Sequence, residues 1–266
     1  MKIIQTATFE TDNAPWTSNS GLCHSYSGTR VSTFKKSGTQ SFRAELNDTD
    51  SNCNFGMRAE LSNRFLALAT YENWFSLDIY YPAGKLHDTL PETHFQMHDN
   101  ANIGSPYWGL TLIKDRLYIG TNVYNQVTGV NIFKAWDIGS AVKGQWQTYT
   151  IYHNCKNDGT GTTKFYLNGQ IIIGQPVVPS YGANIGSPEA MDFTGITNLS
   201  TKTDGTPDGF PYLKFGIYKW QWPATAHTVT QSVVYFDNVS IGNNECQLSD
   251  FYTPANARRF KNHPDN

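Results

Sequence analysis

The 266-residue sequence has no continuous apolar segment of about 18 residues, so it predicts no transmembrane helix. Only 16% of the residues are charged, and the formal net charge is −2, with lysine and arginine spread along the chain. A chain without a basic excess is poorly suited to binding nucleic acid through bulk charge. We therefore expect neither a membrane nor a nucleic-acid partner. Residues 1–5 are too short and too polar to be a signal peptide.

Cysteine is scarce, and its four positions are widely spaced: Cys23, Cys53, Cys155 and Cys246. Because no C-x-x-C pair occurs, a zinc knuckle or a thioredoxin-like redox site is not expected. The even number allows up to two disulfides in three full pairings, which the spacing leaves open. Three Asn-x-Ser/Thr sequons slightly favour a secreted protein. We expect an extracellular protein whose leader is not part of this sequence.

Helical periodicity is also nearly absent, whereas alternation of period two recurs along the chain. In 74–81, the side chains of Phe75, Leu77 and Ile79 point to one face of a predicted strand. Further strands are predicted at 92–98, 108–114, 116–120, 146–152, 163–167, 170–174, 212–220 and 233–241. Asn168-Gly169 predicts a type I′ hairpin turn between two of them.

Short strands, frequent turns and no linker predict one all-β domain. We expect a β-jelly roll, a concanavalin A-like sandwich of two curved antiparallel sheets, over residues 1–250. Residues 251–266 are predicted to be a solvated tail, and the domain is expected to be a monomer. The segment 175–210 is rich in Gly, Pro, Asn and Thr and is predicted to be a long loop.

Three of the predicted strands carry unusual polar groups on the face opposite their apolar residues. These groups are Arg58 and Glu60; His94, Gln96 and His98; and Tyr212, Lys214, Tyr218 and Trp220. A single Arg, His or Tyr on a strand is usually structural. Their co-occurrence on aromatic-rich strands favours the floor of a sugar-binding groove. Gly216 leaves room on that face for a close approach to the sheet.

A short internal repeat includes the first of these strands. The sequence Arg-Ala-Glu-Leu occurs at 43–46 and again at 58–61. The interval of fifteen residues suits two strands and a connection, which could be neighbours in one sheet.

The chain resembles the jelly-roll polysaccharide lyases through three segments in order. They are Arg58-Ala59-Glu60-Leu61, Gln96-Met97-His98 and Lys214-Phe215-Gly216-Ile217-Tyr218. The alginate lyases of this group carry R-[ST]-E-L, Q-[IV]-H and Y-F-K-A-G-x-Y-x-Q at these places. Flanking segments 74–82, 165–169 and 235–239 are more similar to the glucuronan lyase and heparin lyase branches. The likeness extends from about residue 40 to 242.

The chain departs from the alginate lyase pattern at two positions. Residue 59 is Ala instead of Ser or Thr, and Gln221 falls one residue later than in Y-x-Q. Heparin lyases are usually strongly basic, and this chain is not. The resemblance therefore implies an acidic, unsulfated uronate polymer as substrate. A glucuronan-type polymer is favoured, endo-acting cleavage is expected, and alginate is the alternative.

The resemblance implies a β-elimination that removes the C5 proton of a uronate and expels the 4-linked sugar. Arg58 and Gln96 would neutralise the substrate carboxylate, and His98 could donate a hydrogen bond or act as base. Tyr218 stands where the family places its acid. In glucuronate and mannuronate, H5 and O4 lie on the same side of the ring. Tyr218 could then serve both atoms, provided that nearby Arg and Lys depress its pKa. Guluronate would need a separate base, for which His98 is the candidate.

Other residues are expected to contact substrate or metal. Those predicted to bind substrate are Glu60, Tyr80, His94, Tyr212, Lys214, Lys219 and Trp220, where Lys219 faces the groove only if its strand ends there. No cofactor is required for catalysis. Many relatives hold a structural calcium, and Glu10 and Asp237 could ligate it here.

Two other functional classes fit parts of the pattern. A non-catalytic glycan-binding module would need the aromatic groove but not Tyr218 together with Arg58, Gln96 and His98. A sandwich-fold glycoside hydrolase would need paired acids, usually spaced as E-x-D-x-x-E, and no such spacing occurs.

Overall fold

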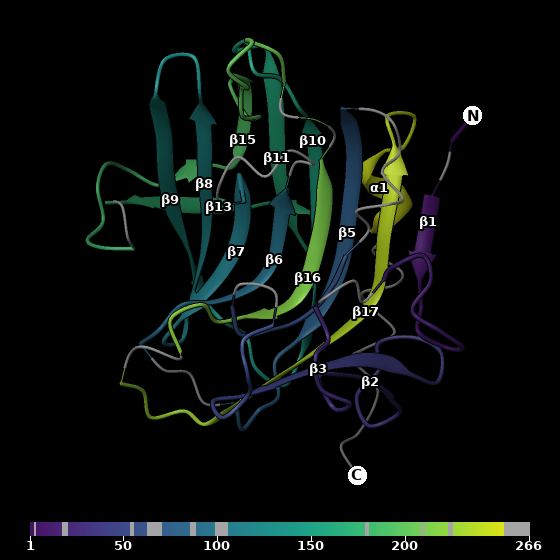
Figure 1. Cartoon of the computed structure of the whole chain (residues 1–266). Helices are drawn as coiled ribbons and strands as arrows, with labels where there is room; N and C mark the ends of the chain where they lie inside the picture. Colours follow the sequence, from purple (N-terminus) through teal and green to yellow (C-terminus); the bar gives the residue numbers. More distant parts are fainter. Residues whose placement is uncertain are drawn as a thin grey trace.

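The computed structural model describes residues 1–2, 4–17, 21–53, 56–62, 71–85, 89–98, 106–178, 181–207, 209, 211–222 and 226–252. Its strands form two antiparallel sheets that face each other (Figure 1). The predicted jelly-roll sandwich is confirmed. Most of the predicted tail, at 253–266, lies outside the described residues.

One sheet has nine strands. Its path runs through β12 (Gln170–Ile171), β11 (Gly161–Leu167), β10 (Trp146–Asn154), β5 (Glu72–Tyr80), β17 (Gln231–Asn243), β3 (Ser41–Asn47) and β2 (Gly28–Val31). Two further strands join this path at its sides: β1 (Ile4–Ala7) pairs with β17, and β15 (Asp192–Ile196) pairs with β11.

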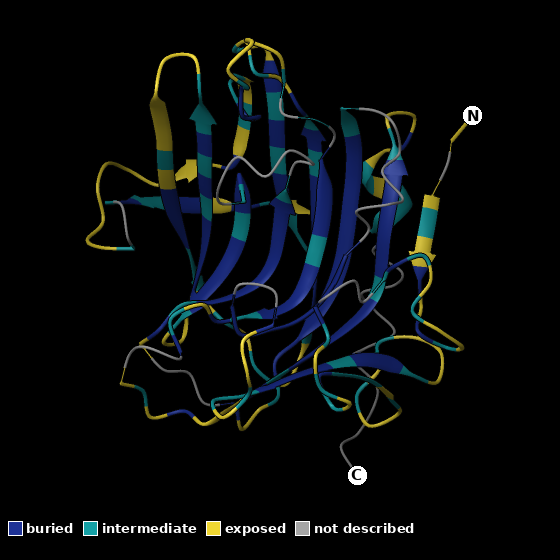
Figure 2. Ribbon diagram, in the orientation of Figure 1, coloured by how far each residue is buried: buried dark blue, intermediate teal, exposed yellow. Residues whose placement is uncertain are grey.

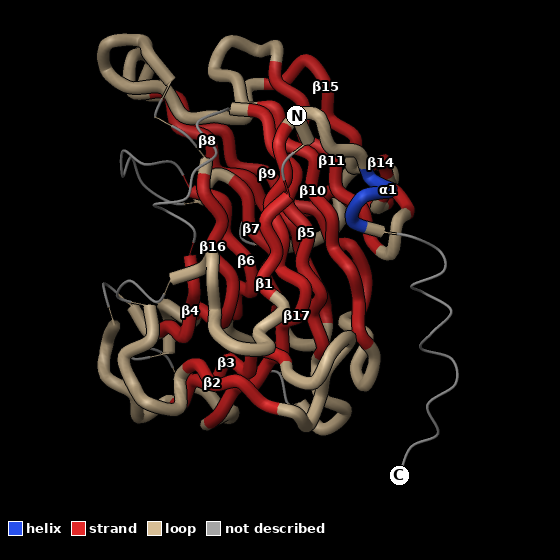
Figure 3. Tube along the Cα trace, turned by 90° about the vertical axis from the view of Figure 1, so that its right-hand side faces the viewer, coloured by secondary structure: helices blue, strands red, loops and turns tan. Residues whose placement is uncertain are grey.

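The second sheet has eight strands. Its order is β14 (Glu189–Ala190), β13 (Ile173–Val177), β9 (Val130–Ser140), β8 (Arg116–Asn125), β7 (Trp108–Ile113), β6 (Glu92–His98), β16 (Tyr212–Tyr218) and β4 (Arg58–Ser62). The view turned by 90° shows this sheet and the nine-stranded sheet as two layers (Figure 3). Among the described residues, the one α-helix, α1 (Leu248–Phe251), has four residues and is far too short to cross a membrane.

Alternation along the strands builds the core between the layers. Phe215 of β16 packs against Phe236 of β17 with ring centroids 5.2 Å apart, against Phe42 of β3 at 5.9 Å and against Trp16 at 5.1 Å. Phe215 is fully buried, and burying such a side chain stabilises the fold by about 1.5–3 kcal/mol. The buried residues occupy the middle of both sheets, and exposed ones gather in the connecting loops (Figure 2). This aromatic core holds β16 firmly from behind.

Local features agree with several predictions and correct one. Asn168 and Gly169 both have positive φ, 50° and 77°, as a type I′ turn requires. Of the three possible disulfide pairings, the structure shows Cys23–Cys53 and leaves the other two cysteines buried as thiols. The prediction of a continuous loop over 175–210 is wrong, because this segment contains β14, β15 and part of β13. Backbone pairing with β11 and β9 gives it strand structure despite its weak alternation.

Candidate active site

The three motif segments fold into neighbouring strands, with β16 between β4 and β6. On the β4 side, the register places Tyr218 opposite Arg58 and Gly216 opposite Glu60. The core-facing residues of β4 and β16 alternate with these positions, so these side chains lie on the outer face of the eight-stranded sheet. We call this face the groove face.

On the β6 side, the register places Lys214 opposite Gln96 and Tyr212 opposite His98. Phe95 and Met97 of β6 face the core, so Gln96 and His98 face the same way as Tyr212 and Lys214. All four residues predicted to be catalytic therefore share the groove face.

Those four residues and Glu60 form one continuous series of contacts. The Arg58 guanidinium lies 4.4 Å from the centroid of the Tyr218 ring, and Arg58 Nη1 is 3.5 Å from Glu60 Oε2. Gln96 Nε2 donates to Glu60 Oε1 at 2.5 Å, and Gln96 Oε1 is 3.1 Å from His98 Nε2. Because a carboxylate only accepts, the bond to Glu60 fixes which end of the Gln96 amide faces His98. His98 Nε2 must then carry the hydrogen, and Nδ1 is the acceptor of the ring.

Gly216 allows two of these strands to meet closely. A Cβ at this position would lie 2.1 Å from the carbonyl oxygen of Ala59, and the φ of Gly216 is +140°. The space that Gly216 leaves is therefore occupied by the backbone of β4. No side chain projects from Gly216 into the groove, and the Glu60–Gln96 hydrogen bond crosses β16 next to it.

Burial sets the charge states of this face. Glu60 is only 3% exposed, and burial raises its pKa, opposed by the charges of Arg58 and Lys214. Burial also raises the pKa of Tyr218, against the Arg58 charge that lowers it. The condition that nearby cations depress the pKa of Tyr218 below its usual value is therefore not met. The phenol carries its proton at neutral pH.

The catalytic candidates are spread along the face. His98 pairs with Tyr212, six positions before Tyr218 on β16. At the usual rise per residue this is about 20 Å between the two backbone positions, while the side chain of His98 reaches to within 3.1 Å of Gln96. Tyr218 and Arg58 touch each other at one end of the contact series, while His98 lies at the other end.

Two residues predicted to bind substrate face the core instead. The pairing of β6 with β7 shifts register between Thr93 and Phe95. This bulge turns His94 inward, where it is fully buried. Strand β16 ends at Tyr218, but Lys219 continues the alternation and is 1% exposed. The predictions for His94 and Lys219 are therefore wrong.

The inward residues form a buried charged cluster around Glu92. The carboxylate of Glu92 lies 2.8 Å from Lys85 Nζ, 3.4 Å from His94 Nε2 and 3.6 Å from Lys219 Nζ. Burial alone would raise the pKa of Glu92, but its interactions with Lys85, His94 and Lys219 hold that pKa far below its usual value. The cluster anchors the segment that follows Tyr218 from behind the sheet.

Tyr80 is also misplaced by the sequence prediction. It lies on β5 of the nine-stranded sheet, where it stacks on Phe34 at 4.7 Å and packs on Trp146 at 5.4 Å. Alternation along the strand correctly predicted that the Tyr80 side chain points away from the core. The outer face to which it points, however, belongs to the nine-stranded sheet. Tyr80 does not line the groove face.

The remaining substrate-binding candidates do lie on the groove face. The Tyr212 ring stacks on His98 at 5.6 Å, and Lys214 Nζ lies 5.8 Å from the Tyr212 ring. Trp220 is 38% exposed, with its ring centroid 5.5 Å from that of Tyr218. An exposed indole beside the phenol can stack on a sugar ring.

An aromatic extension of this face was not predicted from the sequence. Tyr118 of β8 packs on Tyr181 at 5.2 Å, and Tyr181 Oη lies 3.5 Å from Thr111 Oγ1 of β7. The alternation of Tyr118 with core-facing Leu117 and Ile119 was a usable signal for Tyr118. Tyr181 lies between strands, where alternation gives no signal.

The two carboxylates predicted to bind calcium both accept hydrogen bonds from the protein. Glu10 accepts hydrogen bonds from the backbone of Thr39 and Gln40, at 2.9 and 3.3 Å. Asp237 accepts from the backbone N–H groups of Lys36, Ser37 and Asn238. Within the described ranges no group of three or more His, Cys, Asp or Glu could hold a metal. Glu10 and Asp237 hold the 36–40 loop in place, and their role as calcium ligands stays a prediction.

The chain is similar to known proteins in its family and in its fold. The model of the family described as Polysaccharide lyase matches residues 8–240. No curated protein matches the sequence. The fold is similar to an endo-β-1,4-glucuronan lyase from the fungus Trichoderma reesei, with a TM-score of 0.62, 14% identity, and coverage of 85% of this chain and 94% of that one. It is also similar to the cellulose-induced protein Cip1, with a TM-score of 0.50, 14% identity, and coverage of 89% and 96%.

Proposed function

This chain belongs to the polysaccharide lyase family, and we propose from its groove face that it cleaves a 4-linked uronate polysaccharide by β-elimination. One observation carries the proposal: the guanidinium of Arg58 lies over the ring of Tyr218, 4.4 Å from its centroid, on a face of the sheet that also holds Gln96. A cation for the substrate carboxylate and a proton carrier for the reacting atoms thus stand side by side.

The elimination needs charge stabilisation before proton transfer. The C5–H bond breaks, its electron pair forms the C4=C5 double bond, and the C4–O4 bond breaks to release the leaving sugar, which takes up a proton. The C5 proton becomes acidic only as the carboxylate charge is neutralised. Arg58 supplies a planar fork of donors, and its Nε has no hydrogen-bond partner within the described part of the chain. Gln96, already oriented by Glu60, supplies a second donor.

Tyr218 is the residue that we assign to both proton transfers. It touches Arg58 directly, whereas His98 contacts Gln96 at the other end of the contact series. When H5 and O4 lie on the same side of the ring, one phenol reaches both atoms. The phenolate, a minor species at neutral pH because burial raises the pKa of Tyr218, removes the C5 proton, and the resulting phenol returns that proton to O4.

The other groove residues are assigned to neighbouring sugar units. Lys214 pairs with carboxylates of adjacent uronates, and His98, held by Gln96 and stacked on Tyr212, accepts a hydrogen bond from a sugar hydroxyl through Nδ1. Trp220 supplies an exposed ring on the Tyr218 side. A groove that binds several units supports endo-acting cleavage.

A glucuronan-type polymer is the favoured substrate. Glucuronate has the same-side arrangement of H5 and O4 that a single tyrosine needs. The net charge of −2 does not suit a densely sulfated polymer. The similar fold of a fungal glucuronan lyase adds support, with alginate as the alternative substrate.

The Cys23–Cys53 disulfide supports a secreted enzyme, and we propose that it acts as a monomer.

Ultraviolet absorbance tests the proposal, because the product carries an unsaturated uronate. The protein is incubated with glucuronan, polymannuronate, polyguluronate, heparin and hyaluronan. Absorbance growing together with new reducing ends, fastest on glucuronan, is the expected result. Reducing ends without absorbance would indicate a hydrolase. Binding with neither signal would indicate a glycan-binding module.

A further inference from the structure

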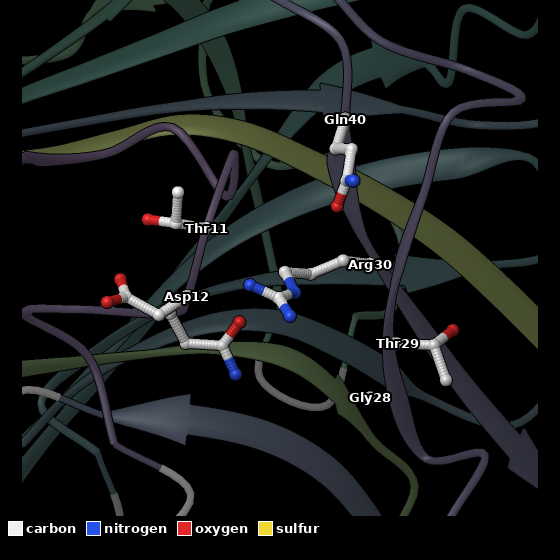
Figure 4. Close-up of a pocket in the computed structure, with 7 residues that line it drawn as sticks. Thr11, Asp12, Gly28, Thr29, Arg30 and Gln40 are labelled. Atoms are coloured by element: carbon white, nitrogen blue, oxygen red, sulfur yellow. The ribbon is translucent and has the colours of Figure 1, made fainter.

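A polar pocket lies outside the groove face. It has a volume of about 690 Å³ and is formed by the segment after β1, by β2 and by the residue preceding β3. Thr11 and Asp12 form one wall, Arg30 projects from β2 and Gln40 faces it from the other side (Figure 4). None of these residues belongs to the contact series around Tyr218.

The walls of this pocket are braced by the protein. Glu10, directly before Thr11 and Asp12, accepts hydrogen bonds from the backbone N–H groups of Thr39 and Gln40. Asp12 Oδ1 accepts from the N–H of Ala14, which orients the Asp12 carboxylate. The pocket is therefore held open by fixed hydrogen bonds between segments about 30 residues apart.

Arg30 gives the pocket its chemical character. Its side chain is exposed, and no ion pair or hydrogen bond of its guanidinium occurs in the part of the chain that the structure describes. A planar guanidinium without a protein partner is suited to a carboxylate. Asp12 in the same pocket repels a bare anion such as sulfate but accepts hydrogen bonds from hydroxyl groups. A ligand that carries both a carboxylate and hydroxyls satisfies the two residues together.

We propose that this pocket binds a uronate unit of the polysaccharide outside the catalytic groove. The inference rests on the proposed function for its ligand class. The backbone between the two sites is short: Leu22 bridges Ala59 on the β4 edge of the groove sheet, and β2 begins at Gly28. A chain that fills the groove face and also reaches this pocket is longer than an oligosaccharide that fills the groove face alone. The pocket therefore raises the affinity for polymer and leaves short substrates unaffected.

Kinetics on two substrate lengths tests the proposal. We compare wild type, Arg30→Gln and the charge-matched control Lys134→Gln, an exposed cation on β9 that lies outside the pocket. Arg30→Gln should raise KM for polyglucuronate about 3- to 5-fold, as expected for an exposed charge pair, with kcat unchanged. KM for a tetrasaccharide should not change, and the control should match wild type. An equal KM for polymer in Arg30→Gln and wild type overturns the proposal.

Direct binding separates failure of this proposal from failure of the proposed function. If no uronate polymer is cleaved, wild type and Arg30→Gln are run by affinity electrophoresis in gels containing polyglucuronate. Weaker retardation of Arg30→Gln supports the pocket even then, and equal retardation overturns it. Asp12→Asn should also weaken retardation. If it instead strengthens retardation and sodium sulfate competes at equal ionic strength, the pocket is a simple anion site and the sugar assignment is wrong.

Discussion

The pH dependence of turnover follows directly from the burial of Tyr218. Burial raises the pKa of its phenol above the usual value of 10, and Arg58 only partly opposes this shift. At pH 7 less than about one molecule in a thousand then carries the phenolate. If the phenolate is the base, kcat/KM rises about tenfold per pH unit, or about 100-fold between pH 7 and pH 9.

Initial rates of absorbance growth from pH 6 to pH 9.5 on glucuronan measure this dependence. Circular dichroism at each pH confirms that the protein stays folded. Tyr218→Phe should lose a factor of at least about 10²–10⁴ in kcat at every pH, while binding of oligosaccharide persists. The control is Tyr235→Phe, on the nine-stranded sheet, which should keep the wild-type profile.

A plateau near neutral pH would refute the assignment of the base. An imidazole titrates in that range, so a plateau there, together with loss of turnover in His98→Ala, would make His98 the base. Retention of most activity in Tyr218→Phe would remove Tyr218 from the chemistry altogether.

Three further predictions follow from the same face and its supports. Arg58→Lys keeps the charge but loses the planar fork, so kcat should fall about 10²-fold; an unchanged kcat would exclude Arg58 from the site. Gly216→Ala places a Cβ 2.1 Å from the Ala59 carbonyl oxygen at a φ of +140°, so urea unfolding should show a loss of about 3 kcal/mol or more. The control Gly129→Ala, at positive φ in open space, should cost clearly less, and equal losses would rule out the clash. Burial raises the pKa of Asp237 to about 6 from 3.8. A carboxyl with a raised folded-state pKa stabilises the fold below its unfolded pKa and loses that stabilisation as pH rises through its folded pKa. The contribution of about 3 kcal/mol should therefore disappear between pH 4 and 6, and Asp237→Asn should remove this part of the pH dependence. A variant with the wild-type pH profile would contradict the assignment.

Much of the fold could be predicted from local patterns. The face of each motif strand follows from its alternation, and Met57, Leu213 and Phe215 point into the core as expected. The Asn168-Gly169 turn follows from two residues that tolerate positive φ. These features depend on neighbours along the chain, so the sequence contains them directly.

Other features depend on register and pairing, which local patterns do not specify. A single bulge at His94 turned this residue and Glu92 from the groove to the core, because one extra residue reverses the alternation. The disulfide pairing and the strands within 175–210 were likewise decided by contacts between distant segments.

The two Arg-Ala-Glu-Leu segments show most clearly which features follow from the local sequence and which follow from tertiary contacts. Both form strands in which the Arg and Glu contact each other, Arg43 with Glu45 and Arg58 with Glu60. The sequence by itself determined the strand, its two faces and this local pair. Only the tertiary structure decided that the first segment lies in the nine-stranded sheet, while the second lies beside Tyr218. The reason is physical: side-chain alternation is a property of one strand, but a site requires neighbouring strands, and their order is set by how the two apolar faces pack together.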